Sequence, residues 1–192
     1  KKSADILNEL TKTITKSETL EDFVIYTDTD SVYLSIDKLI TMYNLDFYKE
    51  GMVGVTDKGL KLCSKIEKNL NEGIKRWGEK KLNSIDCRFE FKMEAVADKG
   101  FFIKKKKYIL HILNDEGFDV KEESNRWKYK GVSLVSASMP AAVKPLVKNV
   151  VEKLITTGKK SVSDEIYFDT YEQFKSMTVN DFSLIKSINK YR

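Results

Sequence analysis

Apolar residues recur at three- and four-residue steps in four parts of the chain, which is the spacing of a helix with one buried face. The predicted helices are residues 3–16, 57–78, 143–154 (ending before Gly158) and about 162–174. The second is the longest, and Thr56 or Asp57 is its expected N-cap, because both side chains accept hydrogen bonds from free amides of a first turn.

Aromatic and β-branched residues are concentrated in shorter runs, which predicts strands. These runs are residues 23–26, 32–36, 87–96 and 101–113. Between the first two lies Thr27-Asp28-Thr29-Asp30-Ser31, whose residues favour a turn. The pattern therefore predicts an α+β fold in which an early helix leads into a β-hairpin with acidic residues at its tip.

The composition changes after Gly131. Residues 133–140 are small and polar, and the segments beyond them have only helical periodicity. We therefore expect two domains, an α+β part over residues 1–134 and a helical part over residues 135–192.

Charge and cysteine content exclude only a few functional classes. The net charge is +5, from 34 basic and 29 acidic residues, which allows an anionic partner without requiring one. Cys63 and Cys87 lie far apart without a CxxC motif, so we expect reduced thiols in a cytosolic protein rather than a zinc or disulfide site. No apolar run is long enough to span a membrane. The start KKSADILNEL has a helical pattern, unlike a signal peptide, and without an initiator Met it favours a fragment or a processed chain.

The acidic turn is the first candidate for chemistry. Asp28 and Asp30 lie one residue apart between two strands, a rigid place from which to present carboxylates to divalent cations such as those of two-metal phosphoryl transfer. The alternative is an Asx-turn, in which each aspartate only caps the backbone.

The run Lys104-Lys105-Lys106-Lys107-Tyr108 is the second candidate. If the segment is one strand, Lys104, Lys106 and Tyr108 share one face, and Lys105 and Lys107 the other. Lysine beside tyrosine suits a phosphate backbone and the adjoining sugar–base edge. The alternative is an edge strand protected from aggregation by charge.

Two further residues have simpler interpretations. His111, the only histidine, is expected to be packed or at the surface rather than catalytic. Glu94 shares a predicted strand face with Lys92, so a cross-strand partner is the default interpretation.

Taken in order, these segments resemble family B DNA polymerases of the T4-like phage type. Tyr-Thr-Asp-Thr-Asp-Ser (residues 26–31) resembles the YGDTDS motif, and Phe-Lys-Met-Glu-Ala-Val (residues 91–96) resembles an LEFEKV-like strand. Lys-Lys-Lys-Tyr (residues 105–108) resembles the KKRY element that follows it, and residues 131–155 resemble the passage from palm to thumb. DTDS alone is a moderate signal, whereas the ordered series is a specific one that covers nearly the whole chain.

The resemblance implies a partial palm (residues 1–134) followed by a partial thumb (residues 135–192). It implies that Asp30 is the principal ligand bridging two Mg²⁺ ions, that Asp28 is a weaker or outer-sphere ligand, and that Glu94 and Ser31 lie near the metal site. The residues implied to contact primer–template DNA are Lys105, Lys106, Lys107 and Tyr108. The implied reaction is attack of a primer 3′-hydroxyl on the α-phosphate of a deoxynucleoside triphosphate.

The sequence also departs from the family pattern. Thr27 stands where the family usually has Gly, so the turn must use ordinary geometry there. The DxxSLYPS-like motif with the other metal-binding aspartate is missing, as is the KxxxNSxYG-like nucleotide-binding helix. We therefore expect that the isolated chain does not polymerise DNA, and that it is a fragment or a split-gene product completed by a partner chain carrying the N-terminal polymerase part. The expected location is the cytoplasm of a phage-infected bacterium.

Two interpretations from other functional classes stay open. The first is a basic, non-catalytic DNA-binding module, whose affinity would fall steeply with salt. The second is a structural subunit in which the acidic hairpin is only a turn and neither metal nor DNA binds.

Overall fold

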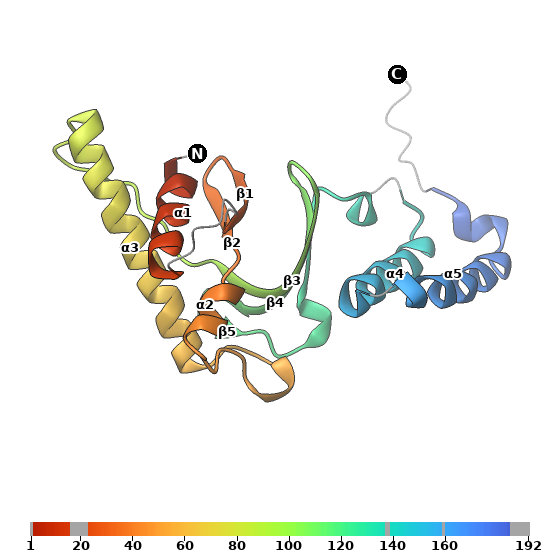
Figure 1. Ribbon diagram of the computed structural model, residues 1–192. Helices are drawn as coiled ribbons and strands as arrows, with labels where there is room; N and C mark the ends of the chain where they lie inside the picture. The colour runs from red at the N-terminus through yellow and green to blue at the C-terminus, as the bar shows by residue number, and fades with distance from the viewer. Residues whose placement is uncertain (1, 16–22, 137–138, 159, 185–192) are drawn as a thin grey trace, which may run out of the picture. The chain divides into compact units, whose positions relative to one another are not determined.

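The structure, a computed structural model, describes residues 2–15, 23–136, 139–158 and 160–184 (Figure 1). The α-helices of this part are α1 (Lys2–Thr15), α2 (Asp37–Met42), α3 (Asp57–Leu82), α4 (Val143–Thr157) and α5 (Lys160–Lys175). The strands are β1 (Val24–Asp28), β2 (Ser31–Leu34), β3 (Ala95–Lys104), β4 (Lys107–Asp115), β5 (Phe118–Asp119) and β6 (Trp127–Lys130). The predicted α+β class is confirmed. None of the described helices combines the length and the apolar character that crossing a membrane would need.

The strands form two sheets. β1 and β2 make a two-stranded antiparallel sheet, and β4 lies between β3 and β5, with β6 also paired to β4. The chain divides into two compact units. Unit 1 consists of Lys1–Asp98 with Ile112–Arg126, and unit 2 of Lys99–His111 with Trp127–Arg192. The division predicted near residue 134, between palm and thumb, stays a prediction.

The first core of unit 1 joins α1, α3 and the β1–β2 hairpin. Leu7 of α1 packs with Leu70 and Ile74 of α3, and α1 lies along α3 (Figure 1). α3 begins as predicted: the Gly59 amide donates to the Thr56 hydroxyl at 3.1 Å. The predicted helix is confirmed and extends one turn further, to Leu82.

A second core of unit 1 is built from Phe47, Val55, Val96 and Leu113. The loop that carries Phe47 and Val55 closes on itself, since the Thr56 amide donates to the Phe47 carbonyl at 2.9 Å. Neither this loop nor the short helix α2 was predicted from the periodicity of the sequence.

The strand predicted over residues 87–96 is wrong for most of its length, because β3 begins only at Ala95. The segment before it satisfies its backbone with side chains of α3 instead of a neighbouring strand. The Asn71 side chain donates to the Phe91 carbonyl and accepts from its amide, both at 2.8 Å, and the Met93 amide donates to Glu67 at 2.6 Å. A segment whose hydrogen bonds go to a helix does not need a strand partner.

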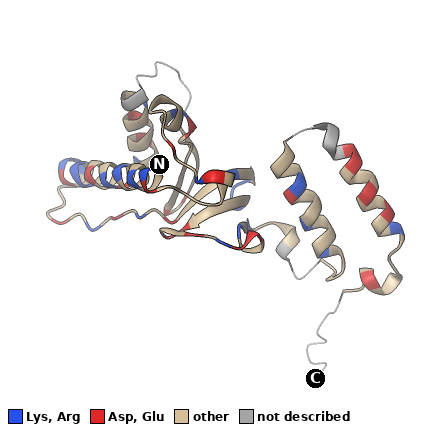
Figure 2. Ribbon diagram, turned by 90° about the horizontal axis from the view of Figure 1, so that it is seen from below, with Lys and Arg blue, Asp and Glu red and all other residues tan. Residues whose placement is uncertain are grey.

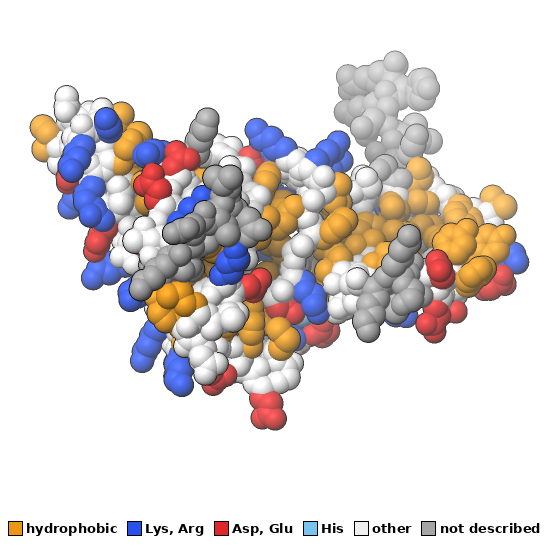
Figure 3. Space-filling model, in the orientation of Figure 1, with side chains coloured by type: hydrophobic (Ala, Val, Ile, Leu, Met, Phe, Trp, Pro, Cys, Tyr) orange, Lys and Arg blue, Asp and Glu red, His pale blue; other side chains and the backbone are white. Residues whose placement is uncertain are grey.

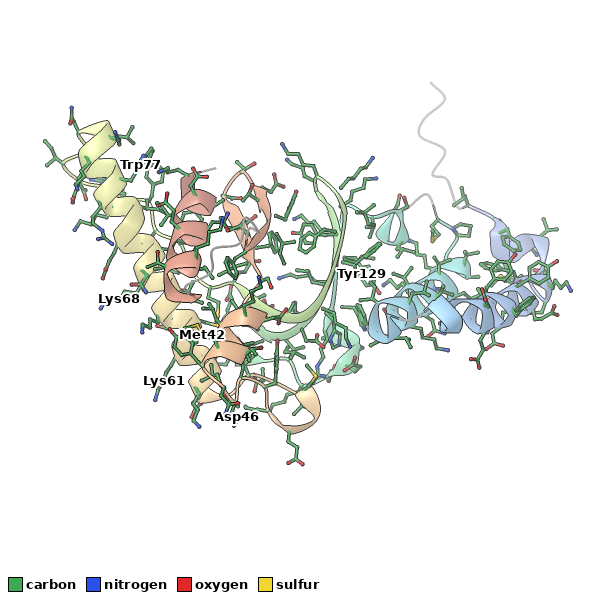
Figure 4. All side chains as sticks on the ribbon, in the orientation of Figure 1. Met42, Asp46, Lys61, Lys68, Trp77 and Tyr129 are labelled. Carbon is green, nitrogen blue, oxygen red and sulfur yellow. The ribbon has the colours of Figure 1, made fainter. Side chains whose placement is uncertain are left out.

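Unit 2 has its own core. Ile109, Val132 and Leu134 are buried, and apolar residues of α4, including Val147 and Val151, pack against them. The predicted helix over residues 143–154 is confirmed and ends at Gly158, whose φ of 62° is the left-handed geometry of a helix C-cap. The Tyr129 hydroxyl donates to the Glu152 carboxylate, which ties β6 to α4 (Figure 4 labels Tyr129). α5 covers the predicted helical stretch of residues 162–174.

Candidate functional site

The predicted acidic hairpin is present in unit 1. β1 and β2 pair antiparallel, with Thr27 opposite Val32 and Asp28 opposite Ser31, so the connection is Thr29-Asp30. The rings of Tyr26 and Tyr33 lie 5.5 Å apart between the strands. The sequence therefore located both the turn and its two acids.

The base of this hairpin is fixed to α1. The side-chain oxygen of Asn8 accepts from the amides of Phe23 and Val24, each at 2.9 Å, and the Ser35 amide donates to the Phe23 carbonyl at 2.8 Å. A groove of about 400 Å³ beside it is lined by α1 residues, among them Asp5 and Asn8, and by residues 24–27. These bonds hold the acidic tip on a rigid base.

The two carboxylates differ in their surroundings. Asp30 is exposed at the tip, whereas Asp28 is half-buried at the end of β1. The Thr29 hydroxyl donates to the Asp28 carboxylate at 3.3 Å, and the Ser31 hydroxyl donates to the Asp28 carbonyl at 3.2 Å. Across the described residues, no backbone amide donates to either carboxylate, so the Asx-turn alternative is not formed. Both carboxylates keep lone pairs available for a cation.

The backbone of the turn is strained at one residue. Thr29 has a φ of 31°, a region that β-branched residues rarely adopt. Thr27, which stands where the resembled family has Gly, lies inside β1 and has no positive φ, so the geometry expected for it is confirmed. A glycine at position 27 would have indicated a positive φ there, whereas the residue with the positive φ is Thr29, two residues later.

The hairpin fits a partial metal site. Mg²⁺ is commonly held in proteins by one or two carboxylates, with waters and substrate phosphates completing the octahedron. Asp28 and Asp30 supply two such groups from one turn. In the described part of the chain, no group of three or more His, Cys, Asp or Glu residues is arranged to hold a metal ion.

The other two residues predicted near the metal are placed differently. Ser31 is bonded to the Asp28 carbonyl, as described above. Glu94 is exposed, and its carbonyl accepts from the Glu116 amide at 2.7 Å. The strand face that Glu94 was predicted to share with Lys92 does not form, because neither residue belongs to a strand. The place of Glu94 near a metal stays a prediction.

The lysine run belongs to unit 2, and the single strand predicted over residues 101–113 is wrong. β3 ends at Lys104, Lys105 and Lys106 form a two-residue turn, and β4 begins at Lys107. Lys106 has a φ of 63°, so the alternation that placed Lys104, Lys106 and Tyr108 on one face does not hold. The physical reason is charge: Lys104, Lys105 and Lys106 are exposed at the hairpin tip, where their ammonium groups reach water, which a position inside a sheet would not allow.

Tyr108 is held at the base of this tip. It pairs with Lys130 of β6, and its ring lies 5.6 Å from that of Phe102 on β3. Gly131 follows β6 and approaches the turn so closely that an added Cβ would lie 2.1 Å from the Lys106 carbonyl oxygen. Sequence reasoning missed this role of Gly131. The available signal was a glycine directly after the alternating run Trp127–Lys130.

His111 is buried against Trp127, with ring centroids 4.8 Å apart, which confirms the packed interpretation. It lies on β4 among apolar neighbours, between Leu110 and Ile112.

Comparison with known proteins supports the polymerase resemblance. No protein-family model matches the chain. The chain is 23% identical over 193 residues to the DNA-directed DNA polymerase of Enterobacteria phage T4, covering 88% of this chain and 19% of that protein. It is 28% identical over 149 residues to the DNA-directed DNA polymerase of Escherichia phage RB69, covering 72% of this chain and 16% of that protein. The chain thus spans less than a fifth of the length of either relative. The similarity supports a relationship to phage DNA polymerases.

Proposed function

We propose that the chain is a palm and thumb part of a DNA-directed DNA polymerase and supplies the hairpin carboxylates of its nucleotidyl-transfer site. One observation carries the proposal: Asp28 and Asp30 flank a tight turn on an anchored hairpin, and neither carboxylate binds a backbone amide of the described chain. The similarity to two phage polymerases supports the same assignment.

Each acid has a distinct role in this proposal. Asp30, exposed at the tip, is the principal ligand for Mg²⁺, and Asp28 is a weaker or outer-sphere ligand. Ser31 fixes the end of the hairpin, and Glu94 lies near the metal. Bound Mg²⁺ supplies stabilisation of the charge on the attacking 3′-oxygen and the departing pyrophosphate. Two carboxylates are too few to hold two cations, so the remaining ligands and the nucleotide-binding groups come from an N-terminal polymerase part, in this proposal on a partner chain.

The lysine turn contacts the primer–template. Lys105 and Lys106 are exposed at the tip and Lys107 is half-buried at the start of β4, and in this proposal all three contact phosphates while Tyr108 contacts the sugar–base edge. These contacts do not discriminate between base sequences, as expected of an enzyme that copies any template.

Metal binding by the isolated chain is the direct test. Mn²⁺, which replaces Mg²⁺ on carboxylates and broadens nearby NMR signals, should broaden the amide signals of residues 27–32. Asp30→Asn should remove this broadening, whereas Asp46→Asn, a change of an exposed acid elsewhere in unit 1 (Figure 4), should not. If the hairpin signals are unaffected by Mn²⁺, or are broadened equally in Asp30→Asn, the metal assignment fails.

Primer extension tests whether the chain needs a complementary polymerase part for activity. The isolated chain with Mg²⁺ and nucleotides should give no extension, and activity should appear only with the complementary polymerase part. In that assembly Asp30→Ala should abolish turnover and leave DNA binding largely intact. Extension by the isolated chain would contradict the need for a partner.

A non-catalytic DNA-binding module is the second candidate, and the solvated lysine turn favours it. It predicts DNA binding that depends on Lys105–Lys107 and on salt but does not change with divalent metal or with Asp30. Binding of a primer–template with and without Mg²⁺, in the wild type and in Asp30→Asn, separates the two functions.

A further inference from the structure

The solvent-facing side of α3 changes character halfway along the helix. Its first three turns carry four exposed lysines, here called the α3 lysine stripe: Lys58, Lys61, Lys65 and Lys68. Figure 2 shows the basic residues along this helix, and in Figure 4 Lys61 and Lys68 project from it away from the core. The spacing of three, four and three residues keeps all four side chains on one face.

No acid neutralises the stripe from within. Glu67 is the only acid between Lys58 and Lys68, and it points to the core side, where it accepts the Met93 amide at 2.6 Å. Asp57 lies four residues, or about one helical turn, before Lys61, but the two form no ion pair. Among the described residues, none of the four lysines is ion-paired.

The second half of the same helix has the pattern of an ordinary solvated face. Glu72 and Glu79 each lie three or four residues from Lys75 and Arg76, and Lys80 and Lys81 follow in the last turn, where basic residues are favourable at a helix C-terminus. Neighbouring lysines at these spacings repel one another and destabilise a helix. Asp57 and Glu72, four residues from Lys61 and Lys68, offset part of this cost, and an anion that approaches the stripe would offset the rest. The space-filling view shows basic side chains along this edge of unit 1 (Figure 3).

We infer that the α3 lysine stripe is a binding surface for a nucleic-acid phosphate backbone, separate from the lysine turn of unit 2. With a rise of about 1.5 Å per residue, the stripe is roughly 15 Å long. One strand of a duplex carries a phosphate about every 3.4 Å of its axis, so four ammonium groups over about 15 Å approach the linear charge density of one strand. The choice of nucleic acid over an acidic protein rests on the proposed function and the polymerase relatives.

Salt dependence of DNA binding by the whole chain tests the inference. The stripe variant replaces the four lysines with glutamine, and its matched control replaces Lys75, Arg76, Lys80 and Lys81, which are exposed on the same helix. The slope of log affinity against log salt is negative, and on a duplex the stripe variant should reduce its magnitude by about 3.6, or about 0.9 for each of the four lysines. On single-stranded DNA the reduction should be about 2.8. The control variant should reduce the magnitude of the salt slope by less than half as much. Comparing the two DNAs identifies which form supplies the backbone. Circular dichroism confirms that α3 remains helical in both variants.

A lysine-turn variant, Lys105, Lys106 and Lys107 to Gln, separates this inference from the proposed function. If the lysine-turn variant has a smaller salt slope and the stripe variant keeps the wild-type slope, the stripe inference is overturned. The proposed contact of the lysine turn with DNA then stands. If only the stripe variant loses slope, the inference stands and the proposed contact of the lysine turn fails. Absence of DNA binding by the wild type overturns both. Displacement of duplex by polyglutamate at equal charge concentration would show a general polyanion surface and overturn the assignment to nucleic acid.

Discussion

Gly131 lies directly against the carbonyl of Lys106 in unit 2. A Cβ on Gly131 would stand 2.1 Å from that oxygen, and Gly131 has a φ of 61°. Lys106 itself has a φ of 63°, so two residues with left-handed geometry lie against each other, one just after β6 and the other at the end of the lysine turn. The turn that carries the proposed DNA contacts is therefore held from outside its own hairpin.

Gly131→Ala should destabilise the protein and displace the lysine turn. The added methyl group cannot fit against the carbonyl, and alanine is strained at this φ, so we expect a loss of about 2–3 kcal/mol in the free energy of unfolding. Urea denaturation measures the loss. DNA affinity should also fall, because Lys105–Lys107 leave their positions.

Gly158→Ala is the matched control for this prediction. Gly158 has nearly the same φ, 62°, but no atom lies within 4 Å of its added Cβ. Its loss should be limited to the backbone strain, about 1 kcal/mol, with DNA affinity unchanged. Equal losses in the two variants would show that contact with the Lys106 carbonyl contributes nothing.

Tyr129→Phe should weaken the joint between β6 and α4. Burial and the bond to Glu152 raise the pKa of Tyr129, so the hydroxyl stays protonated and donating across the neutral range. Removing it leaves a carboxylate without its donor, and we expect a loss of about 1–2 kcal/mol in unfolding free energy. Tyr167→Phe, at an exposed tyrosine of α5, should change stability by less than about 0.5 kcal/mol. Comparable effects of the two changes would contradict a role for the Tyr129–Glu152 bond.

The parts of the fold that sequence predicted were those decided by local chemistry. Helical spacing, the Thr56 N-cap and the Gly158 C-cap depend on residues a few positions apart, and all three are present in the structure. The strand over residues 87–96 was wrong because its hydrogen bonds are made by Asn71 and Glu67, which lie 20 and 26 residues earlier on α3. A hydrophobic pattern does not reveal a partner at that distance.

In the candidate site, too, the sequence predicted one turn and missed the other. The acidic turn was found because its Asp, Thr and Ser residues favour turns and strand-forming residues flank it. The break at Lys105–Lys106 was missed because no Gly, Asn, Asp or Pro marks it. Lysine at positive φ is uncommon, and here the neighbouring Gly131 makes room for it. The decisive residue, Gly131, directly follows β6, which pairs with β4 on the side opposite β3, so a local sequence pattern does not reveal it.

Asp119 should make the stability of unit 1 sensitive to acid. Burial opposes its ionisation, but hydrogen bonds from Lys49, the Asn114 side chain and the Val55 amide outweigh that effect and lower the pKa of Asp119 below its ordinary 3.8. A lowered folded-state pKa means that the stabilisation is present above pH 3.8 and is lost as the pH falls through the folded value. In Asp119→Asn, the fall in melting temperature below about pH 4 should be smaller than in the wild type. Asp46→Asn, at an exposed acid, should leave the wild-type profile unchanged. A wild-type acid profile in Asp119→Asn would contradict this role.

Cys63 should be a slow nucleophile despite its position on the partly exposed helix α3. Desolvation of Cys63, which is partly buried against the core of Phe47 and Val55, raises the pKa of its thiol to about 11. At pH 8 only about one thiol in a thousand is then ionised, and the thiolate is the form that reacts. In a Cys87→Ser background, alkylation by iodoacetamide should speed up about tenfold per pH unit from pH 8 to pH 10 and reach no plateau in that range. The same chain in urea should level off near pH 9, the ordinary value of the thiol. Since the folded state keeps its proton longer than the unfolded state, the free energy of unfolding should also decline as the pH rises from about 9 to 11, and Cys63→Ala should remove that decline. A plateau near pH 9 in the folded chain would show that the thiol is not buried as the structure places it.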